Sequence, residues 1–433
     1  MPKQFLGVLM YWYHGETKHS YYSVRSNPNQ MDWALQPSTY KNYPDSFEKI
    51  ELDVNNLWHS VIYHAVSIST KKYYPTGTHR FLRVNPSAGA LYPNELYFQA
   101  RGVDGFEDGL YHYEVETNRA VLLYRLKVGE GIEPYMGFET AMQGLLFLVS
   151  AVYYRSSWKY KNRAFRYCLL DAGHVLGSLE HSALLMSKEL DMVYDIKRSK
   201  LNEMFGFESR EYFLSGASLA VPLTDEVKAL DFELMYVEAS GTFEQNELME
   251  ISYRQTSHLL EKKAQKESPK FDYEKVRLKE SILKRRSQRG FEGHGITKAE
   301  YLKIMEAVTA PILSDCDEDI ELFVVLNKVH HMPLGLYHNG KLLKNEDLSQ
   351  RAGYLCLEQY SLGTQGAMIF FLLSTAKNYQ ALYQKAGIMG QRLYAVTSYL
   401  EIGCSGIGAY YDDEVNAFVE QEGMVLYALA IGR

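Results

Sequence analysis

The sequence predicts an α+β protein built from two diverged copies of one unit. The first observation is a glycine-containing segment, residues 171–179, which resembles residues 385–393 later in the chain. The second is the tetrapeptide Gly-Leu-Tyr-His, which occurs at residues 109–112 and again at residues 335–338. The interval between the copies is far longer than the period of a solenoid, so the repeat indicates a duplicated domain.

Each copy also ends in an apolar run typical of a strand, at residues 212–221 and 424–431. The glycine segments themselves are predicted to be helical, because their apolar residues alternate steps of four and three and so share one face. In the first copy that face comprises Phe165, Leu169, Ala172, Leu176, Leu179, Ala183, Met186 and Leu190. In the second copy it comprises Leu382, Ala386, Met389, Leu393, Val396 and Leu400. Two interpretations stay open: each helix lies in the core of its own domain, or the two helices pack together and clamp the copies into a pseudo-dimer.

A polar, charge-rich stretch from about Ser240 to Lys279 separates the two copies. Its interleaved acidic and basic residues favour a solvated helix or linker over a nucleic-acid-binding patch. We therefore expect an N-terminal unit over residues 1–229, a charged linker or helical connection over residues 230–278, and a C-terminal unit over residues 279–433.

The composition is that of a globular protein, with 46% apolar and 23% charged residues. Acidic residues outnumber basic ones, 53 to 46, and the net charge of −7 disfavours general nucleic-acid binding. The four cysteines are far apart and form no CxxC pair, which disfavours a zinc site and a disulfide framework. The longest apolar runs are too short to cross a bilayer, and the run at residues 5–10 is followed by no cleavage site. We therefore expect a cytoplasmic protein without a membrane or nucleic-acid partner.

The histidines and glycines form no recognisable metal or nucleotide motif. His14 and His19, and likewise His330 and His331, lack companion ligands at a usable spacing, so we expect no metal site. Neither GxGxxG after an early strand nor GxxxxGK[ST] occurs, which argues against a Rossmann or a P-loop nucleotide site.

The most specific segment runs from Arg83 to Tyr97 and reads RVNPSAGALYPNELY. Its small residues follow Pro86, and Gly89 accepts backbone conformations closed to other residues, so that backbone amides could approach a flat ligand. The same pattern is typical of a tight turn that leads into a strand at residues 95–100.

Residues 155–167, which read RSSWKYKNRAFRY, come directly before the first predicted helix of the repeat. The adjacent Lys159 and Tyr160 could transfer protons if burial or a nearby cation lowered their pKa values. The alternative is a solvent-facing lysine beside a packed tyrosine, which composition alone favours.

Two further segments lie in the second copy. Residues 285–291 (RRSQRGF) bring three guanidinium groups and the Ser287 hydroxyl close together, a set that suits a phosphate monoester. The alternative is a basic helix end capped by Gly290. Residues 403–413 (GCSGIGAYYDD) are predicted to form a glycine-rich turn after the second helix of the repeat, which is a weak signal by itself.

Taken together, these segments resemble the SagB/ThcOx-type dehydrogenases of the FMN-dependent nitroreductase superfamily, in the tandem form that carries two nitroreductase-like units. The PSAGALYP run, and WKY followed by RAFRY, are typical of this branch, while RRSxR and GxGAYYDDEV are marks of the superfamily. The resemblance covers nearly the whole chain. It includes an N-terminal signature at residues 13–19, 32–37 and 41–44.

The resemblance implies a role for each of these motifs. The arginine motif and the terminal arginine would hold the phosphate and ribityl end of FMN, the proline-serine loop would line the isoalloxazine, and the late glycines would approach its N5 edge. The residues expected to bind the cofactor are Arg83, Pro86, Ser87, Ala88, Gly89, Arg285, Arg286, Ser287, Arg289, Gly406, Ile407, Gly408 and Arg433. Lys159 and Tyr160 match the Lys-Tyr pair associated with catalysis in the azoline-oxidising members, where they would remove a proton while hydride passes to flavin N5.

The resemblance also implies a fold with two mostly antiparallel sheets, each flanked by helices, in two nitroreductase-like units that form an intramolecular pseudo-dimer. In nitroreductase dimers each flavin lies at the subunit interface. Here the first copy has the Pro86 loop but no RRSxR, and the second has RRSxR but only residues 310–315 near the position of the loop. We therefore expect one complete FMN site per chain and a degenerate second site.

The substrate is less well defined than the cofactor. Only about 50 residues precede the family's early helix at Leu57, so a long N-terminal peptide-recognition region is not expected. Three functions stay open: oxidation of an azoline-type or related peptide substrate, NAD(P)H-dependent reduction of nitro, quinone or ene acceptors, and a flavin-free scaffold in a peptide-modifying complex. The expected partners are a small-molecule or peptide substrate, peptide-modifying proteins, and NAD(P)H as a transient reductant.

Overall fold

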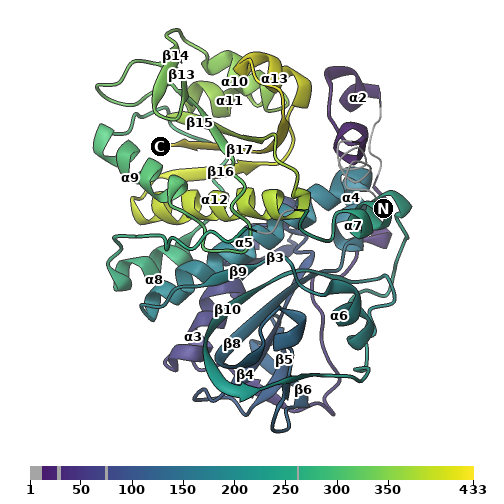
Figure 1. The fold of residues 1–433 in the computed structure, drawn as a ribbon. Helices are drawn as coiled ribbons and strands as arrows, with labels where there is room; N and C mark the ends of the chain where they lie inside the picture. Colours follow the sequence, from purple (N-terminus) through teal and green to yellow (C-terminus); the bar gives the residue numbers. More distant parts are fainter. Residues whose placement is uncertain (1–11, 27–30, 74–76, 261–262) are drawn as a thin grey trace. The chain divides into compact units, whose positions relative to one another are not determined.

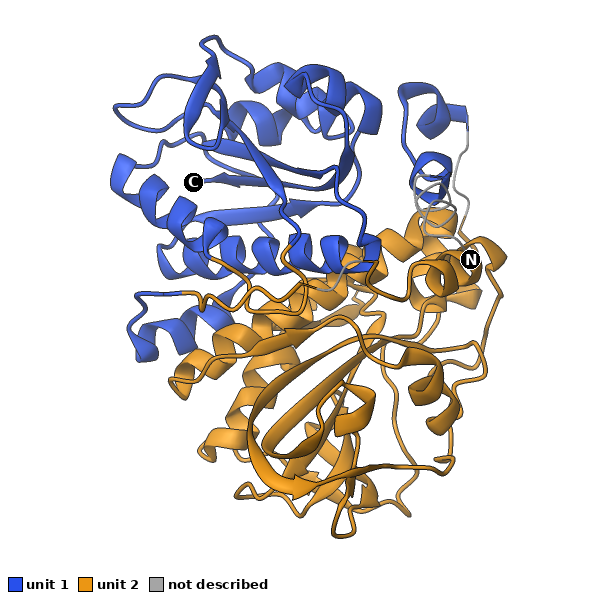
Figure 2. Cartoon of the chain, in the orientation of Figure 1, with its two compact units in different colours: residues 1–30, 270–310, 318–433 blue, residues 31–269, 311–317 orange. Residues whose placement is uncertain are grey.

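The computed structural model describes residues 12–26, 31–73, 77–260 and 263–433 (Figure 1). The predicted apolar run at residues 5–10 lies outside the described residues. The chain divides into two compact units (Figure 2). Unit 1 comprises residues 1–30, 270–310 and 318–433, and unit 2 comprises residues 31–269 and 311–317.

Unit 2 contains a seven-stranded sheet in the order β1-β6-β5-β4-β8-β10-β9, in which every neighbouring pair is antiparallel. The central strand β8 is continuously apolar from Leu145 to Val149 and is buried on both faces, as a strand covered from two sides must be. The strands are β1 (Lys49–Glu51), β4 (Asn94–Arg101), β5 (Gly109–Glu114), β6 (Arg119–Arg125), β8 (Thr140–Ala151), β9 (Asp191–Val193) and β10 (Tyr212–Glu226).

Helix α5 (Ala164–Leu185) is the longest helix of unit 2, and it packs against α3 (Leu57–Val66) and against strands of the sheet. Asn56 starts α3, because its side chain accepts hydrogen bonds from the amides of Trp58 and His59. The other helices are α4 (Tyr154–Tyr160), α6 (Arg198–Met204) and α7 (Glu247–Gln255), with short 3-10 turns η1 (Trp33–Leu35), η2 (Ala88–Ala90), η3 (Glu133–Tyr135) and η4 (Lys161–Arg163).

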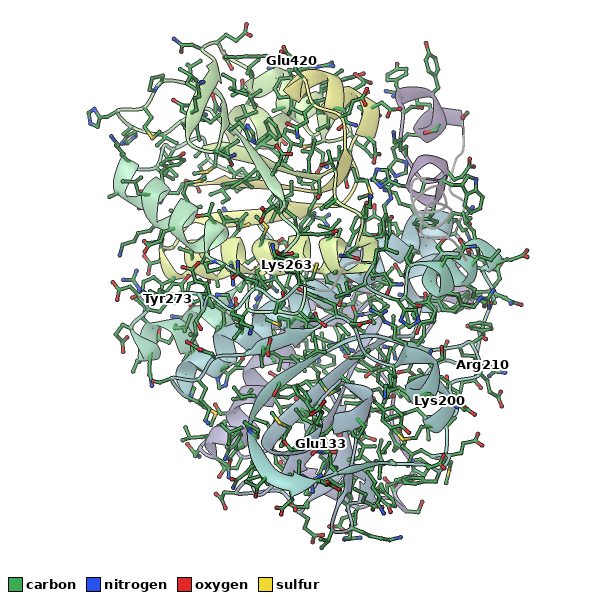
Figure 3. All side chains as sticks on the ribbon, in the orientation of Figure 1. Glu133, Lys200, Arg210, Lys263, Tyr273 and Glu420 are labelled. Carbon is green, nitrogen blue, oxygen red and sulfur yellow. The ribbon has the colours of Figure 1, made fainter. Side chains whose placement is uncertain are left out.

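Two small sheets complete unit 2. One pairs β2 (Ile68–Tyr73) with β3 (His79–Arg83), and the other pairs β7 (Glu130–Gly131) with β11 (Lys228–Ala229). Glu133 of η3, labelled in Figure 3, is completely buried and accepts from the guanidinium of Arg101 at 3.0 Å, which ties η3 to β4.

Unit 1 contains a six-stranded antiparallel sheet in the order β14-β13-β12-β15-β17-β16. Its strands are β12 (Glu321–Leu326), β13 (Gly335–His338), β14 (Lys341–Lys344), β15 (Met368–Ser374), β16 (Gly403–Ile407) and β17 (Met424–Gly432). The long helix α12 (Tyr379–Tyr399) packs against β16, β17, α8 and α9. The other helices are α2 (Tyr21–Ser26), α8 (Lys275–Lys284), α9 (Lys298–Thr309), α10 (Ser349–Leu355), α11 (Tyr360–Gln365) and α13 (Asp412–Val419).

The two large sheets have the same strand order once their strands are numbered by position in each unit. In unit 2 the order β6-β5-β4-β8-β10-β9 carries α5 between β8 and β9, and in unit 1 the order β14-β13-β12-β15-β17-β16 carries α12 between β15 and β16. The repeated Gly-Leu-Tyr-His tetrapeptides fall on β5 and β13, and the repeated glycine segments fall on α5 and α12. The predicted helices and terminal strands are therefore confirmed.

The first repeat helix is shorter than the sequence predicts. It ends at Leu185, and Ser187, two residues later, has a positive φ of 54°, which departs from the helical path. Met186 and Leu190, predicted to continue the apolar face, lie instead in the connection to β9. Each repeat helix packs within its own unit, and the packing of the two helices against each other stays a prediction.

The described N-terminal segment, residues 12–26, belongs to unit 1. The amide of His19 donates to Asp412 at 2.9 Å, and Lys18 pairs with Asp413 at 2.6 Å, so this segment contacts the start of α13. The two compact units are not the same as the two copies of the repeat, so the predicted boundaries at residues 229 and 279 stay predictions. None of the helices in the described ranges combines the length and apolar character needed to cross a membrane.

Candidate functional site

The loop between β3 and β4 in unit 2 contains the predicted proline-serine motif and is a tight turn. Gly89, Ala90 and Tyr92 have positive φ values of 64°, 53° and 46°, and only glycine adopts such values without strain. The hydroxyl of Ser87 accepts from the amide of Tyr92 at 2.9 Å, which closes the turn. The turn then leads into β4, as the sequence predicts.

Asp171 on α5 holds the start of this loop. Its carboxylate accepts from the Ser87 hydroxyl at 2.5 Å and from the Ala88 amide at 3.2 Å. Burial raises the pKa of the Asp171 carboxyl to about 7, although the hydrogen bonds from Ser87 and Ala88 oppose the shift. The motifs do not reveal this residue, and the available signal is an acidic side chain inside an otherwise apolar helical segment.

Gly89 lies against the ends of the two side chains predicted to move protons. A Cβ atom on Gly89 would be 2.7 Å from Tyr160 Oη and 3.2 Å from Lys159 Nζ. The fold of unit 2 therefore brings Lys159 and Tyr160, the predicted proton-transfer pair, to the predicted cofactor loop, although the two segments are about 70 residues apart in the sequence. The sequence indicates that glycine at position 89 gives a flat ligand access to the backbone. The contacts indicate a further role, because the absence of a side chain at Gly89 leaves room for Tyr160 and Lys159.

Lys159 and Tyr160 form the last turn of α4 and are half-buried. The Lys159 ammonium lies 5.4 Å from the centre of the Tyr160 ring, and that ring packs against Tyr167 at 4.3 Å between centroids. The alternative of a solvent-facing lysine does not describe unit 2, because Lys159 is half-buried and its Nζ atom approaches Gly89.

Arg155 ties α4 to the loop and to β4. Its guanidinium donates to Glu95 at 2.5 Å, to the carbonyl of Tyr92 at 3.0 Å and to the carbonyl of Ser38 at 2.8 Å. Because Arg155 precedes Lys159 by four residues, both lie on one face of α4. The bonds of Arg155 therefore fix the helix face that carries the lysine.

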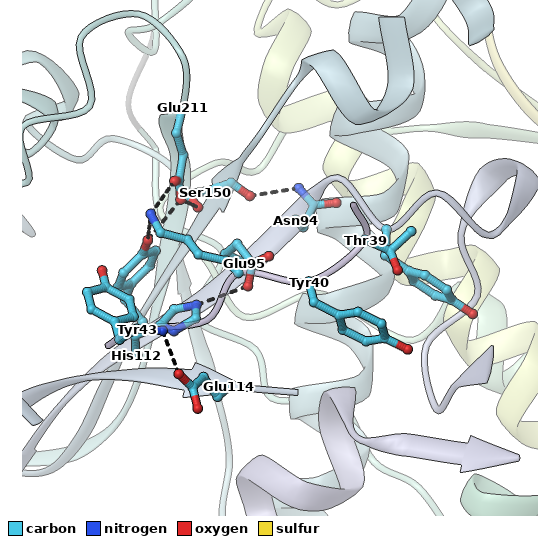
Figure 4. Close-up of polar contacts among 12 residues, drawn as sticks. Thr39, Tyr40, Tyr43, Asn94, Glu95, His112, Glu114, Ser150 and Glu211 are labelled. Atoms are coloured by element: carbon cyan, nitrogen blue, oxygen red, sulfur yellow. Dashed lines mark hydrogen bonds and ion pairs between the residues drawn. The ribbon is translucent and has the colours of Figure 1, made fainter. Parts of the chain in front are cut away.

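Glu95 is the buried counter-ion of Arg155. Its other oxygen accepts from His112 Nε2 at 3.0 Å (Figure 4). Burial by itself raises the pKa of Glu95, but the Arg155 charge and the His112 hydrogen bond overcome it and hold the pKa at about 2. Glu95 therefore stays ionised, which stabilises the Arg155 guanidinium in an interior position.

Arg83 contacts the protein around the loop. Its guanidinium donates to the carbonyl of Thr39 at 2.5 Å and lies 4.6 Å from the centre of the Tyr92 ring. Burial lowers the pKa of Arg83 from its ordinary value. Direct contact between Arg83 and a cofactor stays a prediction.

Residues 32–44, which include two parts of the N-terminal signature, form a strap that is anchored from inside unit 2. Lys41 makes a buried ion pair with Glu211 at 2.7 Å, and Glu211, seen in Figure 4, also accepts from Tyr97 at 3.0 Å. At the start of the strap the Trp158 indole donates to the carbonyl of Asp32 at 3.0 Å. These two parts of the signature are thus explained by polar anchors that hold residues 32–44 against β4, α4 and Glu211 directly before β10.

In unit 1, the arginine motif and the late glycine strand are joined to each other. The segment at Ser287 pairs with Cys404 of β16, where the amide of Gln288 donates to the Cys404 carbonyl at 2.9 Å. The Tyr394 hydroxyl, on α12, lies 2.8 Å from Ser287 Oγ and accepts from the Gly406 amide at 2.6 Å. Tyr394 thus connects the two predicted cofactor segments, although no motif in the sequence marks it.

The cations of the arginine motif differ in their surroundings. Arg285 is buried and stands 5.2 Å from the centre of the Tyr394 ring, whereas Arg289 and Ser287 are exposed. Arg286 donates to the carbonyl of Leu283 at 3.0 Å. The alternative of a helix end capped by Gly290 is wrong, because α8 ends at Lys284 and Arg285 is its C-terminal cap residue.

The terminal arginine has an acidic partner. Arg433 pairs with Glu300 of α9 at 2.5 Å, and its carbonyl accepts from the amides of Glu292 and Gly293. The guanidinium that was expected to help hold a phosphate is therefore paired with Glu300. A role for Arg433 in binding the cofactor stays a prediction.

The glycine-rich segment at residues 403–408 is a strand rather than the predicted turn. Gly403 to Ile407 form β16, which pairs with β17, and Gly408 follows the strand. Pairing with a strand that lies later in the chain overrides the local preference of glycine for turns. Gly406 leaves room for its neighbours, because a Cβ there would collide with the Tyr427 hydroxyl.

The residues present in each unit fit a different part of a flavin. In unit 2, the small residues Ser87 to Ala90 are half-buried on a backbone held rigid by Asp171, which suits contact with a flat ring. In unit 1, the exposed Ser287 hydroxyl and the Arg289 guanidinium lie on the same short segment, which suits a phosphate monoester. Within the described ranges, no group of three His, Cys, Asp or Glu side chains could hold a metal ion.

Comparison with known proteins relates the chain to nitroreductases. No family model matches the sequence. The chain is 33% identical over 104 residues to a protein of Methanocaldococcus jannaschii named "Putative nitroreductase MJ1384". That match covers 24% of this chain and 52% of the relative, so the chain spans about half the length of the curated relative it matches.

One solved structure matches almost the whole fold. It is described as a putative nitroreductase from Anabaena variabilis, and it superposes with a TM-score of 0.80 over 98% of this chain and 99% of that chain, at 24% identity. The chain therefore has a mixed α/β, nitroreductase-like fold.

Proposed function

We propose that the protein is an FMN-dependent oxidoreductase that oxidises an azoline-type or related peptide substrate. The observation that carries the proposal is the approach of Lys159 Nζ and Tyr160 Oη to Gly89 in the proline-serine loop. Similarity to a nitroreductase over 104 residues supports the redox class. FMN, when bound, supplies the acceptor for a hydride equivalent, and the protein positions the substrate and handles the proton.

The oxidation removes two hydrogens from the substrate ring, one as hydride and one as a proton. In this proposal the proton passes to the member of the pair that is deprotonated, either the neutral amine of Lys159 or the phenolate of Tyr160, whose polar ends both lie at the loop. Arg155 and Glu95 keep α4 and the loop in register while the proton moves. Asp171 keeps the loop in its turn through Ser87 and Ala88.

We propose further that the chain is a tandem repeat and binds one FMN. The six strands β6-β5-β4-β8-β10-β9 follow the same order as β14-β13-β12-β15-β17-β16, which supports the repeat. The sequence supports a single FMN, because the proline-serine loop occurs only in the first copy and RRSxR only in the second.

The test is anaerobic oxidation of a thiazoline- or oxazoline-containing peptide, followed by flavin bleaching and by the mass loss of two hydrogens. Lys159→Ala and Tyr160→Phe should each lower turnover by about a hundredfold or more while the flavin remains bound. Bleaching that proceeds at the wild-type rate in both variants would remove the pair from the mechanism.

A second candidate is an NAD(P)H-dependent reductase of nitro, quinone or ene acceptors. The similarity to a protein named as a nitroreductase favours it. Stopped-flow mixing with NADH or NADPH separates the two functions, because rapid flavin reduction together with no peptide oxidation supports the reductase. A colourless protein that also fails to take up added FMN would instead support the flavin-free scaffold.

A further inference from the structure

The hairpin formed by β2 and β3 in unit 2 is a surface element that, apart from Arg83 at its end, has no role in the function proposed above. Its two strands make a sheet of their own, with Lys71 opposite Phe81, Lys72 opposite Arg80 and Tyr73 opposite His79. The chain leaves β3 at Arg83 and enters the proline-serine loop at Pro86. We call residues 68–73 and 77–83 the basic hairpin.

The charge of the basic hairpin is opposite to that of the whole protein. The chain has a net charge of −7, yet residues 54–94 contain no aspartate or glutamate. Within this stretch the hairpin carries Lys71, Lys72, Arg80 and Arg83, of which both lysines are exposed, Arg80 is half-buried and Arg83 is buried. An acid-free basic element on an acidic protein attracts anionic ligands specifically to that element.

One face of the basic hairpin is aromatic as well as basic. Residues that face each other on a ladder, and those two apart on one strand, share a face, so Lys71, Tyr73, His79 and Phe81 lie together. The Lys71 ammonium is 5.2 Å from the centre of the Tyr73 ring and 5.4 Å from that of Phe81. The Tyr73 side chain is 69% exposed and that of Phe81 is 38% exposed, so apolar surface accompanies the charge.

The opposite face sets two cations against each other. Lys72 and Arg80 are directly opposed in the ladder, and like charges in that position destabilise a pair of strands. The face is therefore suited to an acidic side chain, and the aromatic face is suited to an apolar side chain.

We propose that the basic hairpin docks an acidic, extended peptide segment that is part of the substrate, with glutamate or aspartate at Lys72 and Arg80 and apolar side chains at Tyr73 and Phe81. A second copy of the chain is a poorer occupant through this element, since two such hairpins repel each other. Nucleic acid is a poorer occupant because three cations on a protein of net charge −7 neutralise few phosphates. The inference rests on the proposed peptide-oxidising function and names the chemistry of its substrate.

The distance from the basic hairpin to Lys159 and Tyr160 is one that an extended peptide can span. Eight residues separate Phe81 from Gly89, which bounds the distance between them at about 28 Å. An extended peptide of about eight residues covers the same length, so a docked segment can present a ring several residues away to Lys159 and Tyr160.

The experiment measures binding of a fluorescein-labelled peptide of about ten residues, in which glutamate alternates with valine, by fluorescence anisotropy with the full-length protein. A peptide with glutamine in place of every glutamate is compared directly. The triple variant Lys71→Glu, Lys72→Glu and Arg80→Glu should bind the acidic peptide at least about tenfold more weakly than the wild type. Phe81→Ser should weaken binding by about threefold without changing its dependence on salt.

The control variant carries the same change of charge elsewhere on unit 2, at Arg119→Glu, Lys127→Glu and Lys228→Glu, all of which are exposed. It should bind the acidic peptide nearly as well as the wild type. Equal losses in the two triple variants, or equal wild-type affinity for the glutamine peptide, would overturn the proposal. So would a single-stranded DNA of the same charge that binds as tightly as the acidic peptide.

This measurement separates the inference from the proposed function. Peptide binding needs no flavin and no turnover, and a circular dichroism spectrum shows whether each variant is folded. Loss of azoline oxidation together with intact peptide binding would refute the proposed reaction alone, whereas intact oxidation by a protein that binds both peptides equally would refute the docking surface alone.

Discussion

The substitution Gly89→Ala tests the contact on which the proposed reaction depends. Gly89 has a φ of 64°, and a left-handed conformation costs an alanine about 1 kcal/mol relative to glycine. The new Cβ would also lie 2.7 Å from Tyr160 Oη, so the hydroxyl must withdraw by about 0.7 Å to reach the 3.4 Å at which ordinary contacts begin. Because Tyr160 is only half-buried, a small rotation of its side chain allows that withdrawal, and the stability cost is therefore small.

The effect on turnover should be much larger than the effect on stability. A displacement of about 1 Å in a positioned group can lower a rate by about a hundredfold. We expect Gly89→Ala to lose about 1 kcal/mol of unfolding free energy, which urea denaturation measures, and to lose between about tenfold and a hundredfold in kcat.

Gly129→Ala is the matched control. Its φ is 78°, so alanine meets the same backbone strain, but a Cβ at this position has no atom within 4 Å. The two variants should therefore lose similar stability, and only Gly89→Ala should lose activity. Equal turnover in both variants would refute the reasoning, because the approach of Tyr160 and Lys159 to the loop would then have no functional consequence.

Three more predictions follow from the buried polar groups. The pKa of Asp171 rises on folding from its ordinary value of 3.8 to about 7, so its contribution to stability is complete below 3.8 and is lost as the pH rises through 7. Asp171→Asn should therefore gain stability over the wild type by about 4 kcal/mol between pH 4 and pH 8 in urea titrations, and a pH-independent difference would contradict this. Glu95→Gln should lower the free energy of unfolding by about 3–5 kcal/mol, because it leaves Arg155 buried without its counter-ion. The control Glu203→Gln breaks an exposed pair with Lys200, which is labelled in Figure 3, and should change that free energy by less than about 1 kcal/mol. Tyr394→Phe removes the hydroxyl that joins Ser287 to Gly406, so it should lower the free energy of unfolding by about 1–3 kcal/mol and weaken flavin retention in dialysis. The control Tyr337→Phe loses one hydrogen bond to the Pro333 carbonyl and should retain its flavin.

The sequence predicted those parts of the molecule that depend on local pattern. The repeat helices follow from apolar residues three and four apart, and the turn at residues 86–92 follows from proline, serine and glycine in close order. The resemblance implied a proton-transfer role for Lys159 and Tyr160 and a cofactor role for Gly89, but the sequence did not predict that the two side chains lie against Gly89.

The parts that could not be predicted depend on residues far apart in the chain. Nothing near Glu95 in the sequence shows that Arg155 and His112 will enclose it, and the acidic member of the Asp171 contact lies more than 80 residues after Ser87. The first part of the turn predicted at residues 403–413 is a strand for the same reason, since its partner β17 comes only after α13 in the chain. Tyr394 looks like any other aromatic residue on a repeat helix until the fold sets Ser287 and Gly406 beside it.

The central proposal is that one chain binds one FMN. The direct measurement is the ratio of flavin released on denaturation to protein, taken for the wild type, Ser87→Leu and Arg289→Glu after saturation with FMN and gel filtration. The account predicts a ratio of about one for the wild type and a marked fall in both variants, because each disrupts one end of the same ligand. A wild-type ratio of two, or full retention of flavin in either variant, would contradict it.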